Sequence, residues 1–478
     1  MNQEATRAAE ESAATARSQF FAALEHHQAG RLDEAERLYR AIIASGHAIP
    51  QAHNNLGFLL YQRGDRGAAL AEYRKAVEIN PADPGSLTNL GNALRDIDDL
   101  DEAEACYRRA LSIRQDHPEA NNNLGMMLSE RGQHDQALAC YRKALALNPV
   151  FVDALNNSAV AVRRAGQTGD AIELWKKAIS LKPNCVEAHV YLADTLADLG
   201  MLDEARQHAL TADALDLPAR PAIRYALGIA LARCGFRDAA GARLRQCVEG
   251  DPHDRYGARL ALAALDEAPV PKRASDAFIE RLYAMSADRW DSAAGSDLYR
   301  APELVADKVS GHGLDVLDAG CGTGLVGARL RDRSRRLVGV DLSAAMLERA
   351  KSKNVYDELH QDDLVSFMLA RPQAYDVVTG AASLIHFGDL GPAFTAAGSA
   401  LRAGGAFVFT VFPSERNGDF SVASLEGFAK GGCFLHGRDY IAATASASGF
   451  GIETIDSAVH EYKNDSPVAG LVVVLRKP

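Results

Sequence analysis

Cysteine is scarce in this sequence, with seven in 478 residues, and no two of them have Cys-x-x-Cys spacing. They are Cys106, Cys140, Cys185, Cys234, Cys247, Cys321 and Cys433. An odd number without paired spacing argues against a disulfide framework and against a structural zinc site, because both use cysteines in sets. The pattern favours a reducing compartment, so we expect a cytoplasmic protein without a metal centre.

Long apolar runs are also lacking. The N-terminal stretch MNQEATRAAEESAATARSQF is polar and has no apolar core of a signal peptide. The strongest apolar stretches, 406–412 and 471–475, are far shorter than the roughly 20 residues that span a bilayer. Lys and Arg number 52 against 63 Asp and Glu, a formal net charge of −11, so the basic surface of a general nucleic-acid binder is missing. We therefore expect neither a membrane nor a nucleic-acid partner.

Alanine is abundant in the first half of the chain, and this half repeats itself. The segment HNNLGFLLYQRGDRGAALAEYRKAVEINP aligns without gaps with NNNLGMMLSERGQHDQALACYRKALALNP. Gly57, Gly91 and Gly125 recur at a step of 34 residues. This period and pattern resemble the tetratricopeptide repeat, a helix–turn–helix unit. We expect glycine and alanine where the two helices of a repeat cross closely.

Seven repeats are predicted to begin near residues 16, 50, 84, 118, 152, 186 and 221. A capping helix over 254–265 follows, which places an all-α superhelix at 16–266. The next segment, EAPVPKRAS, carries two prolines and mixed charge and is typical of a linker.

Four asparagines, Asn55, Asn89, Asn123 and Asn157, occupy the same repeat position. A regular superhelix would line them up as a ladder of amides in its groove, where each could pair with the backbone of an extended peptide. The spacing resembles the asparagine ladder of O-linked N-acetylglucosamine transferases. It predicts a protein or peptide partner in the groove; the alternative is that asparagine is simply frequent at this consensus position.

Glycine and β-branched residues concentrate after Gly311, and the pattern changes to alternating strands and helices. The apolar run LDVLDAG leads into GCGTG, and the second strand, RLVGVD, ends at Asp341, 21 residues after Gly320. An acidic residue about 20 positions after a glycine-rich turn has the spacing of a ribose-binding βαβ unit.

The wider context resembles the class I S-adenosylmethionine-dependent methyltransferases. The matching segments, in chain order, are VLDAGCGTG, VGVDLSAAMLERAK, HQDDL, AYDVVTGAASLIHF, LRAGG before the strand FVFTVF, and GLVVVLRKP as a last edge strand. With VYDEL and HFGDL added to these segments, the resemblance to tetratricopeptide-repeat methyltransferases covers most of the chain. The resemblance implies a Rossmann-like, doubly wound α/β domain over 276–478 and S-adenosylmethionine as cofactor.

The same resemblance assigns the cofactor residues. Asp318, Gly320, Gly322 and Gly324 would surround the methionine part of the cofactor, and Asp341 would hold its ribose. For Asp318 and Asp341 the alternative is a capping or turn carboxylate.

The adenine would lie beside Leu342 and Met346. Asp363 would accept a hydrogen bond from its amino group, with Asp362 or Leu364 offering backbone groups. The choice between Asp362 and Asp363 is open by one residue.

His386 is the first candidate for a general base, because an imidazole titrates near neutrality. The alternative is a histidine that shapes the pocket wall or caps a helix. His436 is a second candidate, in a predicted substrate loop. Tyr283, Trp290 and Tyr299 precede the sheet, where they either close over the cofactor or only pack.

The sequence thus predicts a methyltransferase whose repeats recruit a substrate or partner. One alternative is a repeat scaffold with a cofactor-binding but catalytically silent domain. A nicotinamide-dependent enzyme is a second alternative, and the G-x-G-x-G spacing disfavours it.

Overall fold

The computed structural model describes residues 2–97, 99–215, 220–284, 299–414, 420–423, 432–463 and 466–478. The chain forms two compact units, Met1–Pro183 and Asn184–Pro478. Trp290 lies outside the described residues. The domain ranges 16–266 and 276–478 stay a prediction.

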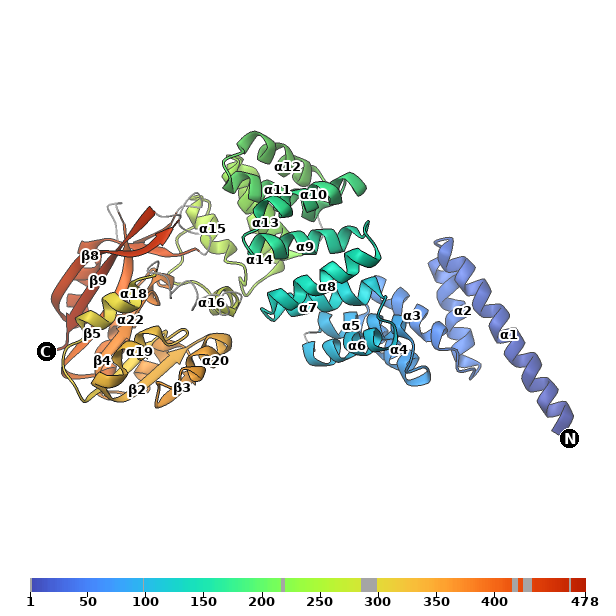
Figure 1. Ribbon diagram of the computed structural model, residues 1–478, viewed down its shortest axis with the longest axis horizontal. Coiled ribbons are helices and arrows are strands. Elements are labelled where there is room, and N and C mark those ends of the chain that lie inside the picture. Colours follow the sequence, from blue (N-terminus) through green and yellow to red (C-terminus); the bar gives the residue numbers. More distant parts are fainter. Residues whose placement is uncertain are drawn as a thin grey trace. The chain divides into compact units, whose positions relative to one another are not determined.

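The first unit consists of helix pairs (Figure 1). Its helices are α1 (Asn2–Gln28), α2 (Leu32–Ala44), α3 (Pro50–Gln62), α4 (Arg66–Ile79), α5 (Pro84–Asp96), α6 (Leu100–Ile113), α7 (Pro118–Glu130), α8 (His134–Leu147), α9 (Val152–Arg164) and α10 (Thr168–Leu181). The first helices of four pairs begin at residues 50, 84, 118 and 152, which confirms the helical repeats. Only α1 differs, because it extends well before residue 16.

The turns inside and between the repeats follow from local chemistry. Asp65 and Asp83 cap α4 and α5 by accepting hydrogen bonds from backbone N–H groups in the first turn. Proline occupies the start of α5, where no N–H partner is needed. Gly64 closes the turn between α3 and α4 with a φ of +84°, which other residues rarely adopt.

The repeat glycines mark close helix crossings. A Cβ on Gly91 would lie 2.6 Å from Tyr107, and one on Gly125 would lie 2.7 Å from Tyr141. Both tyrosines are almost fully buried. The small residues of the 34-residue pattern are therefore fitted to a large aromatic ring on the second helix of the same repeat.

Alanine at Gly91 is expected to lower the free energy of unfolding by about 1–3 kcal/mol, because the added methyl overlaps the Tyr107 ring. Urea unfolding of the full chain, followed by circular dichroism, measures this. Gly67→Ala is the matched control: its Cβ would meet nothing within 4 Å, so it should be neutral or stabilise by less than about 1 kcal/mol. Equal unfolding midpoints for the two variants would refute the crossing argument.

The second unit begins with two further helix pairs, followed by shorter helices. These elements are α11 (Val186–Asp198), α12 (Leu202–Ala214), α13 (Pro221–Arg233), α14 (Arg237–Gly250), α15 (Ala258–Ala264), α16 (Asp276–Ala284) and α18 (Ala301–Lys308). The helix α15 lies within the predicted capping helix. No helix in the described ranges is both long and apolar enough to cross a bilayer.

Within the described residues, the rest of this unit is a nine-stranded sheet with its connecting helices. Its strands are β1 (Leu314–Ala319), β2 (Ser334–Asp341), β3 (Glu358–Gln361), β4 (Tyr375–Gly380), β5 (Leu401–Pro413), β6 (Phe420–Val422), β7 (Phe434–His436), β8 (Gly451–Lys463) and β9 (Ser466–Arg476). The connecting helices are α19 (Leu325–Leu330), η1 (Arg331–Arg333), α20 (Ala344–Ser352), α21 (Leu364–Leu369), η2 (Leu384–His386), α22 (Gly391–Ala400) and α23 (Arg438–Ala447).

The strand order places β1 between β2 and β4, all parallel. The order therefore reverses direction at β1, the point where ligands bind in open α/β sheets. Apolar clusters cover both faces: one is built around Phe394 and Phe407, the other around Val316 and Val408. Burial on both faces accounts for the nearly continuous apolar strands of the sequence.

Two strand predictions need correction. The C-terminal strand β9 is not an edge strand, since it pairs antiparallel with both β5 and β8. Its run Leu471–Leu475 is buried throughout, as an interior strand requires. The segment LRAGG belongs to β5 and forms an irregularity there, because Tyr375 pairs with Leu401 while Val377 pairs with Ala406.

The segment predicted as a linker is bonded to the sheet domain. Lys272 accepts backbone hydrogen bonds of 2.8 Å from Gly388 and from Asp389, and Ala274 donates one of 2.9 Å to His386. Next to it, Leu260 of α15 and Phe278 of α16 share an apolar cluster with strand residues such as Phe434. The two prolines correctly indicated a loop, but they could not show which part of the protein the loop would contact.

Candidate functional site

A cavity of about 770 Å³, part of it open to solvent, lies at the carboxyl ends of β1, β2 and β4. Its lining residues come from the loop after β1, the tips of β2 and β3, the loop after β4, and the helices that precede the sheet. Of the predicted cofactor residues, it includes Gly320, Gly322, Asp341, Leu342, Met346, Asp362 and Leu364. Asp318, Gly324 and Asp363 do not line it.

The glycine-rich loop depends on its glycines for two reasons. Gly320, Gly322 and Gly324 have φ values of +78°, +53° and +89°, in the left-handed region. In addition, a Cβ on Gly320 would lie 2.4 Å from the Cβ of Ser383, in the loop after β4. The loop therefore approaches the loop after β4 closely, and together they form one wall of the cavity.

Asp341 ends β2 and holds the loop in place. Its two carboxylate oxygens accept hydrogen bonds of 2.9 Å from the backbone N–H groups of Gly322 and Ser343. Burial raises the pKa of Asp341, and those hydrogen bonds oppose the rise. Each oxygen has a further lone pair, so the carboxylate can also accept from two neighbouring hydroxyls in the cavity.

Asp318 lies behind the cavity wall. Its carboxylate accepts hydrogen bonds from the Tyr356 hydroxyl at 2.6 Å and the Thr379 hydroxyl at 3.1 Å, and the side chain is fully buried. Burial raises its pKa to about 6, although both hydroxyls counteract the rise. The structure thus gives Asp318 the geometry of a group that joins the end of β1 to β4 and to the segment before β3.

The two acidic residues after β3 differ in exposure and in their partners. Asp362 is exposed and lines the cavity. Asp363 instead caps α21 through Ser366 and pairs with Arg273 at 2.6 Å. Burial alone would raise the pKa of Asp363, but the Ser366 N–H and the Arg273 guanidinium bring it below its usual value. Of the two alternatives, the structure places Asp362 at the cavity.

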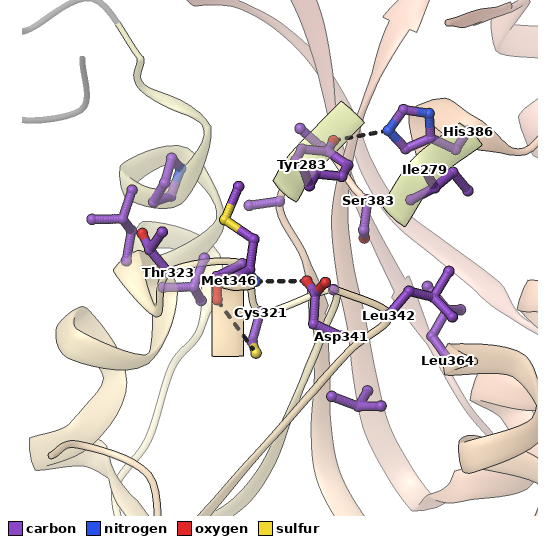
Figure 2. A pocket seen from close by; sticks show the side chains of 18 of the residues that line it. Ile279, Tyr283, Cys321, Thr323, Asp341, Leu342, Met346, Leu364, Ser383 and His386 are labelled. Atoms are coloured by element: carbon purple, nitrogen blue, oxygen red, sulfur yellow. Dashed lines mark hydrogen bonds between the residues drawn. The ribbon is translucent and has the colours of Figure 1, made fainter. Parts of the chain in front are cut away.

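His386, Tyr283 and Ser383 also line the cavity (Figure 2). The Tyr283 hydroxyl and the His386 Nε2 are 2.8 Å apart. The His386 Nδ1 and the Ser383 Oγ are buried without a hydrogen-bond partner among the described residues. Such atoms usually meet a ligand or water. Tyr299 also lines the cavity, as expected for the residues before the sheet.

Burial and the nearby Arg273 charge lower the pKa of His386 to about 4. The imidazole is therefore neutral at pH 7 and a weaker base than a free histidine. His436 lies outside the cavity lining; its Nε2 donates to the Phe387 carbonyl at 2.8 Å, and burial lowers its pKa to about 4 as well. The geometry of His436 is that of a group holding the loop after β4.

The low pKa of His386 makes stability depend on pH. The unfolded chain takes up this proton near pH 6.5 and the folded chain only near pH 4, so stability falls as pH drops through that window. The loss from His386 amounts to at most about 3 kcal/mol. His386→Gln should flatten the pH dependence of urea unfolding between pH 7 and 5, whereas the exposed His253→Gln should not. An equal slope in wild type and His386→Gln would contradict the prediction.

Arg273 and Ser383 are among the lining residues that sequence reasoning did not single out. Arg273 lies in the predicted linker, and Ser383 lies in the segment AYDVVTGAASLIHF, of which His386 was the predicted functional residue. The sequence carried no signal for Arg273 beyond its place in a loop, because its partners lie about 90 and 114 residues further along the chain.

Comparison with known families indicates the kind of domain that contains this cavity. The methyltransferase domain family matches residues 316–405, and tetratricopeptide-repeat families match 16–41, 48–116, 83–149, 127–174 and 162–217. The chain combines tetratricopeptide repeats with a methyltransferase domain.

Methyltransferases are among the curated relatives that match part of the chain. The malonyl-[acyl-carrier protein] O-methyltransferase of Yersinia pestis is 29% identical over 153 residues, 32% of this chain and 55% of that protein. Methyltransferase-like protein 27 of Homo sapiens is 38% identical over 103 residues, 19% and 42% of the two chains. The chain thus spans about half the length of the curated relatives it matches. The solved structure of pilF from Pseudomonas aeruginosa is 23% identical and covers 42% of this chain and 92% of its own, with a TM-score of 0.36.

In the repeats, the four recurring asparagines bond to the preceding repeat. Each donates its side-chain N–H to a polar side chain one repeat earlier. The pairs are Asn55 with Tyr39 at 3.2 Å, Asn89 with Asn54 at 3.0 Å, Asn123 with Asn92 at 2.8 Å, and Asn157 with Asn122 at 3.0 Å. These amides link neighbouring repeats. The four residues are partly exposed, and an amide oxygen has two lone pairs, so each can still accept a hydrogen bond from another donor.

Proposed function

We propose that this chain is an S-adenosylmethionine-dependent methyltransferase whose repeats recruit a substrate or a protein partner. One observation carries the proposal: Asp341, braced by Gly322 and Ser343, faces the same cavity as Asp362 and the glycine-rich loop. That combination suits a ligand with a ribose next to a purine. The proposal includes a cytoplasmic location, on the cysteine pattern of the sequence.

The cavity residues fit an S-adenosyl ligand. The Asp341 oxygens would accept from the ribose hydroxyls, and Leu342, Met346 and Leu364 would provide an apolar surface for the adenine. Asp362 would accept from the adenine amino group. Gly320 and Gly322 would let the loop approach the methionine part, while Asp318 is bonded to Tyr356 behind the cavity wall. The unpartnered Ser383 Oγ and His386 Nδ1 would face the acceptor end.

When bound, S-adenosylmethionine would supply the methyl group of its sulfonium. The acceptor's lone pair would bond to that methyl group in line, and the sulfur would depart as a neutral thioether. The contribution of this chain is then mainly alignment and exclusion of water. His386 was predicted as the base, and we retain it as the candidate catalytic residue. With a pKa of about 4, His386 would take a proton only from a methyl acceptor that hydrogen bonds already hold in place. The hydrogen bond with Tyr283 would fix the orientation of the imidazole ring.

Calorimetry of the full chain with S-adenosylhomocysteine and with NAD tests the cofactor. We expect binding of the first and none of the second. Binding of NAD alone would favour the nicotinamide-dependent alternative, and the absence of S-adenosylhomocysteine binding would refute the proposal.

A labelled-methyl assay on cell extract, fractionated into proteins and small metabolites, tests turnover. Label in protein would favour the repeat groove as the substrate reader, whereas label only in metabolites would make the repeats a docking module. Cofactor binding without transfer to either fraction would favour the alternative of a silent methyltransferase domain on a repeat scaffold.

The asparagine ladder predicts that Asn123→Ala weakens retention of a protein partner from extract on the immobilised chain. The control is Asn92→Ala, which breaks the same hydrogen bond between repeats but keeps the ladder amide. Asn123→Ala should lower stability by about 0.5–1.5 kcal/mol, and Asn92→Ala by more, because it also removes the acceptor of the Tyr107 hydroxyl. Partner retention that is unchanged in Asn123→Ala, or equally reduced in both, would rule out the ladder.

A further inference from the structure

The segment Lys272–Ala274, just before α16, is attached to the loop after β4. Arg273 forms an antiparallel bridge with Phe387, flanked by the hydrogen bonds of Lys272 and Ala274 to that loop. Phe387 and His386 both line the cavity. A segment outside the sheet is therefore held against the cavity by its backbone.

The side chain of Arg273 reaches from this loop to the tip of β3. Its guanidinium carbon lies 4.5 Å from the centre of the Phe387 ring, and its Nη2 lies 2.6 Å from the Asp363 carboxylate and 2.9 Å from Asp276. The Arg273 side chain is 28% exposed and that of Asp363 19%, so solvent screens the pair only in part. Arg273 itself contributes to the lining of the cavity.

From Asp363 the contacts continue into the cavity. The Asp363 backbone N–H donates to the Asp362 carboxylate at 2.8 Å, and the Asp362 N–H donates to the Asp341 carbonyl at 3.2 Å. The orientation of the exposed Asp362 thus depends on where Asp363 is held. Arg273 and the cap of α21 are the two groups that hold the Asp363 side chain.

We propose that Arg273 is a positioning residue for the adenine end of the cavity, acting through Asp363 on Asp362 while its backbone holds the loop after β4. This inference rests on the proposed cofactor. A planar guanidinium suits the position because it pairs with a carboxylate in its plane and stacks on an aromatic ring with its face. The stretch that connects the repeats to the sheet is then part of the binding site.

The test is calorimetry of the full chain with S-adenosylhomocysteine and with 5′-methylthioadenosine, which shares the adenosine but lacks the amino-acid part. Arg273→Gln should weaken both ligands by the same factor, about tenfold. Arg273→Lys keeps the charge near Asp363 but loses the planar pairing and the stacking on Phe387, so it should recover only part of the affinity. Arg331→Gln is the matched control, since it breaks a comparable pair with Asp357 before β3 but does not line the cavity. Its affinities should equal those of the wild type.

Asp363→Asn is the second variant, because asparagine can still cap α21 while the ion pair is lost. It should weaken both ligands as Arg273→Gln does, and the double variant should be no weaker than either single one. Unchanged affinity in both single variants, additive losses, or a loss for S-adenosylhomocysteine alone would overturn the inference. Absence of binding to the wild type would instead overturn the proposed function.

Discussion

Asp341→Ala is expected to weaken S-adenosylhomocysteine binding by about 10- to 150-fold, which corresponds to roughly 1.5–3 kcal/mol. Two effects combine in this loss. The variant removes both acceptor oxygens that would face the ribose, and it frees the Gly322 and Ser343 N–H groups that now fix the loop geometry. Calorimetry on the full chain measures the change.

Two further variants complete the test of the ribose assignment. Asp341→Asn keeps one acceptor oxygen and should lose less affinity than alanine. Asp332→Ala removes an exposed carboxylate on η1, outside the cavity lining, and should bind as the wild type does. If Asp341→Ala binds as tightly as the Asp332→Ala control, the ribose assignment is wrong.

Gly320→Ala is expected to lower both stability and binding. A side chain at φ +78° costs about 1–2 kcal/mol, and its Cβ would lie 2.4 Å from that of Ser383, which adds about 1–3 kcal/mol of overpacking. Since neither loop can move without opening the cavity wall, S-adenosylhomocysteine binding should fall by more than tenfold. Thermal unfolding and calorimetry of the same sample measure the two losses.

The chain offers controls for each part of this cost. Gly404 has a φ of +75° with nothing within 4 Å of its Cβ, so Gly404→Ala should show the backbone cost alone and leave binding unchanged. Adding Ser383→Gly to Gly320→Ala removes the overlap and should recover part of the lost stability. Equal losses in Gly320→Ala and Gly404→Ala would mean that the approach of the two loops contributes nothing.

Local patterns predicted the repeats well. The 34-residue step places glycine opposite tyrosine in successive helix pairs, and the first helices of four pairs of the first unit begin at the predicted residues. The reason is that each repeat contacts mainly its neighbours, so a short sequence period carries nearly all the structural information. The glycine-rich loop and Asp341 were found for a similar reason, because one βαβ unit contains both.

Residues whose role depends on distant partners were less predictable. Asp362 and Asp363 are chemically identical in the sequence, and the tertiary structure distinguishes them: Asp363 caps α21 and pairs with Arg273, whereas Asp362 lines the cavity. Asp318 could be assigned to the cofactor or to the protein, and its bonds to Tyr356 and Thr379 show which groups it faces. The edge position predicted for the last strand failed because β8 folds back along its outer side.

The sequence alone determined the helical repeats, the α/β domain with its glycine-rich loop, and the acidic residue at the tip of β2. All of these depend on neighbours within a few dozen residues. The tertiary structure decided which carboxylate faces the cavity, that His386 is neutral, and that the supposed linker contributes Arg273 to the site. Burial and ion pairing set these properties, and both arise only when segments far apart in the chain come together.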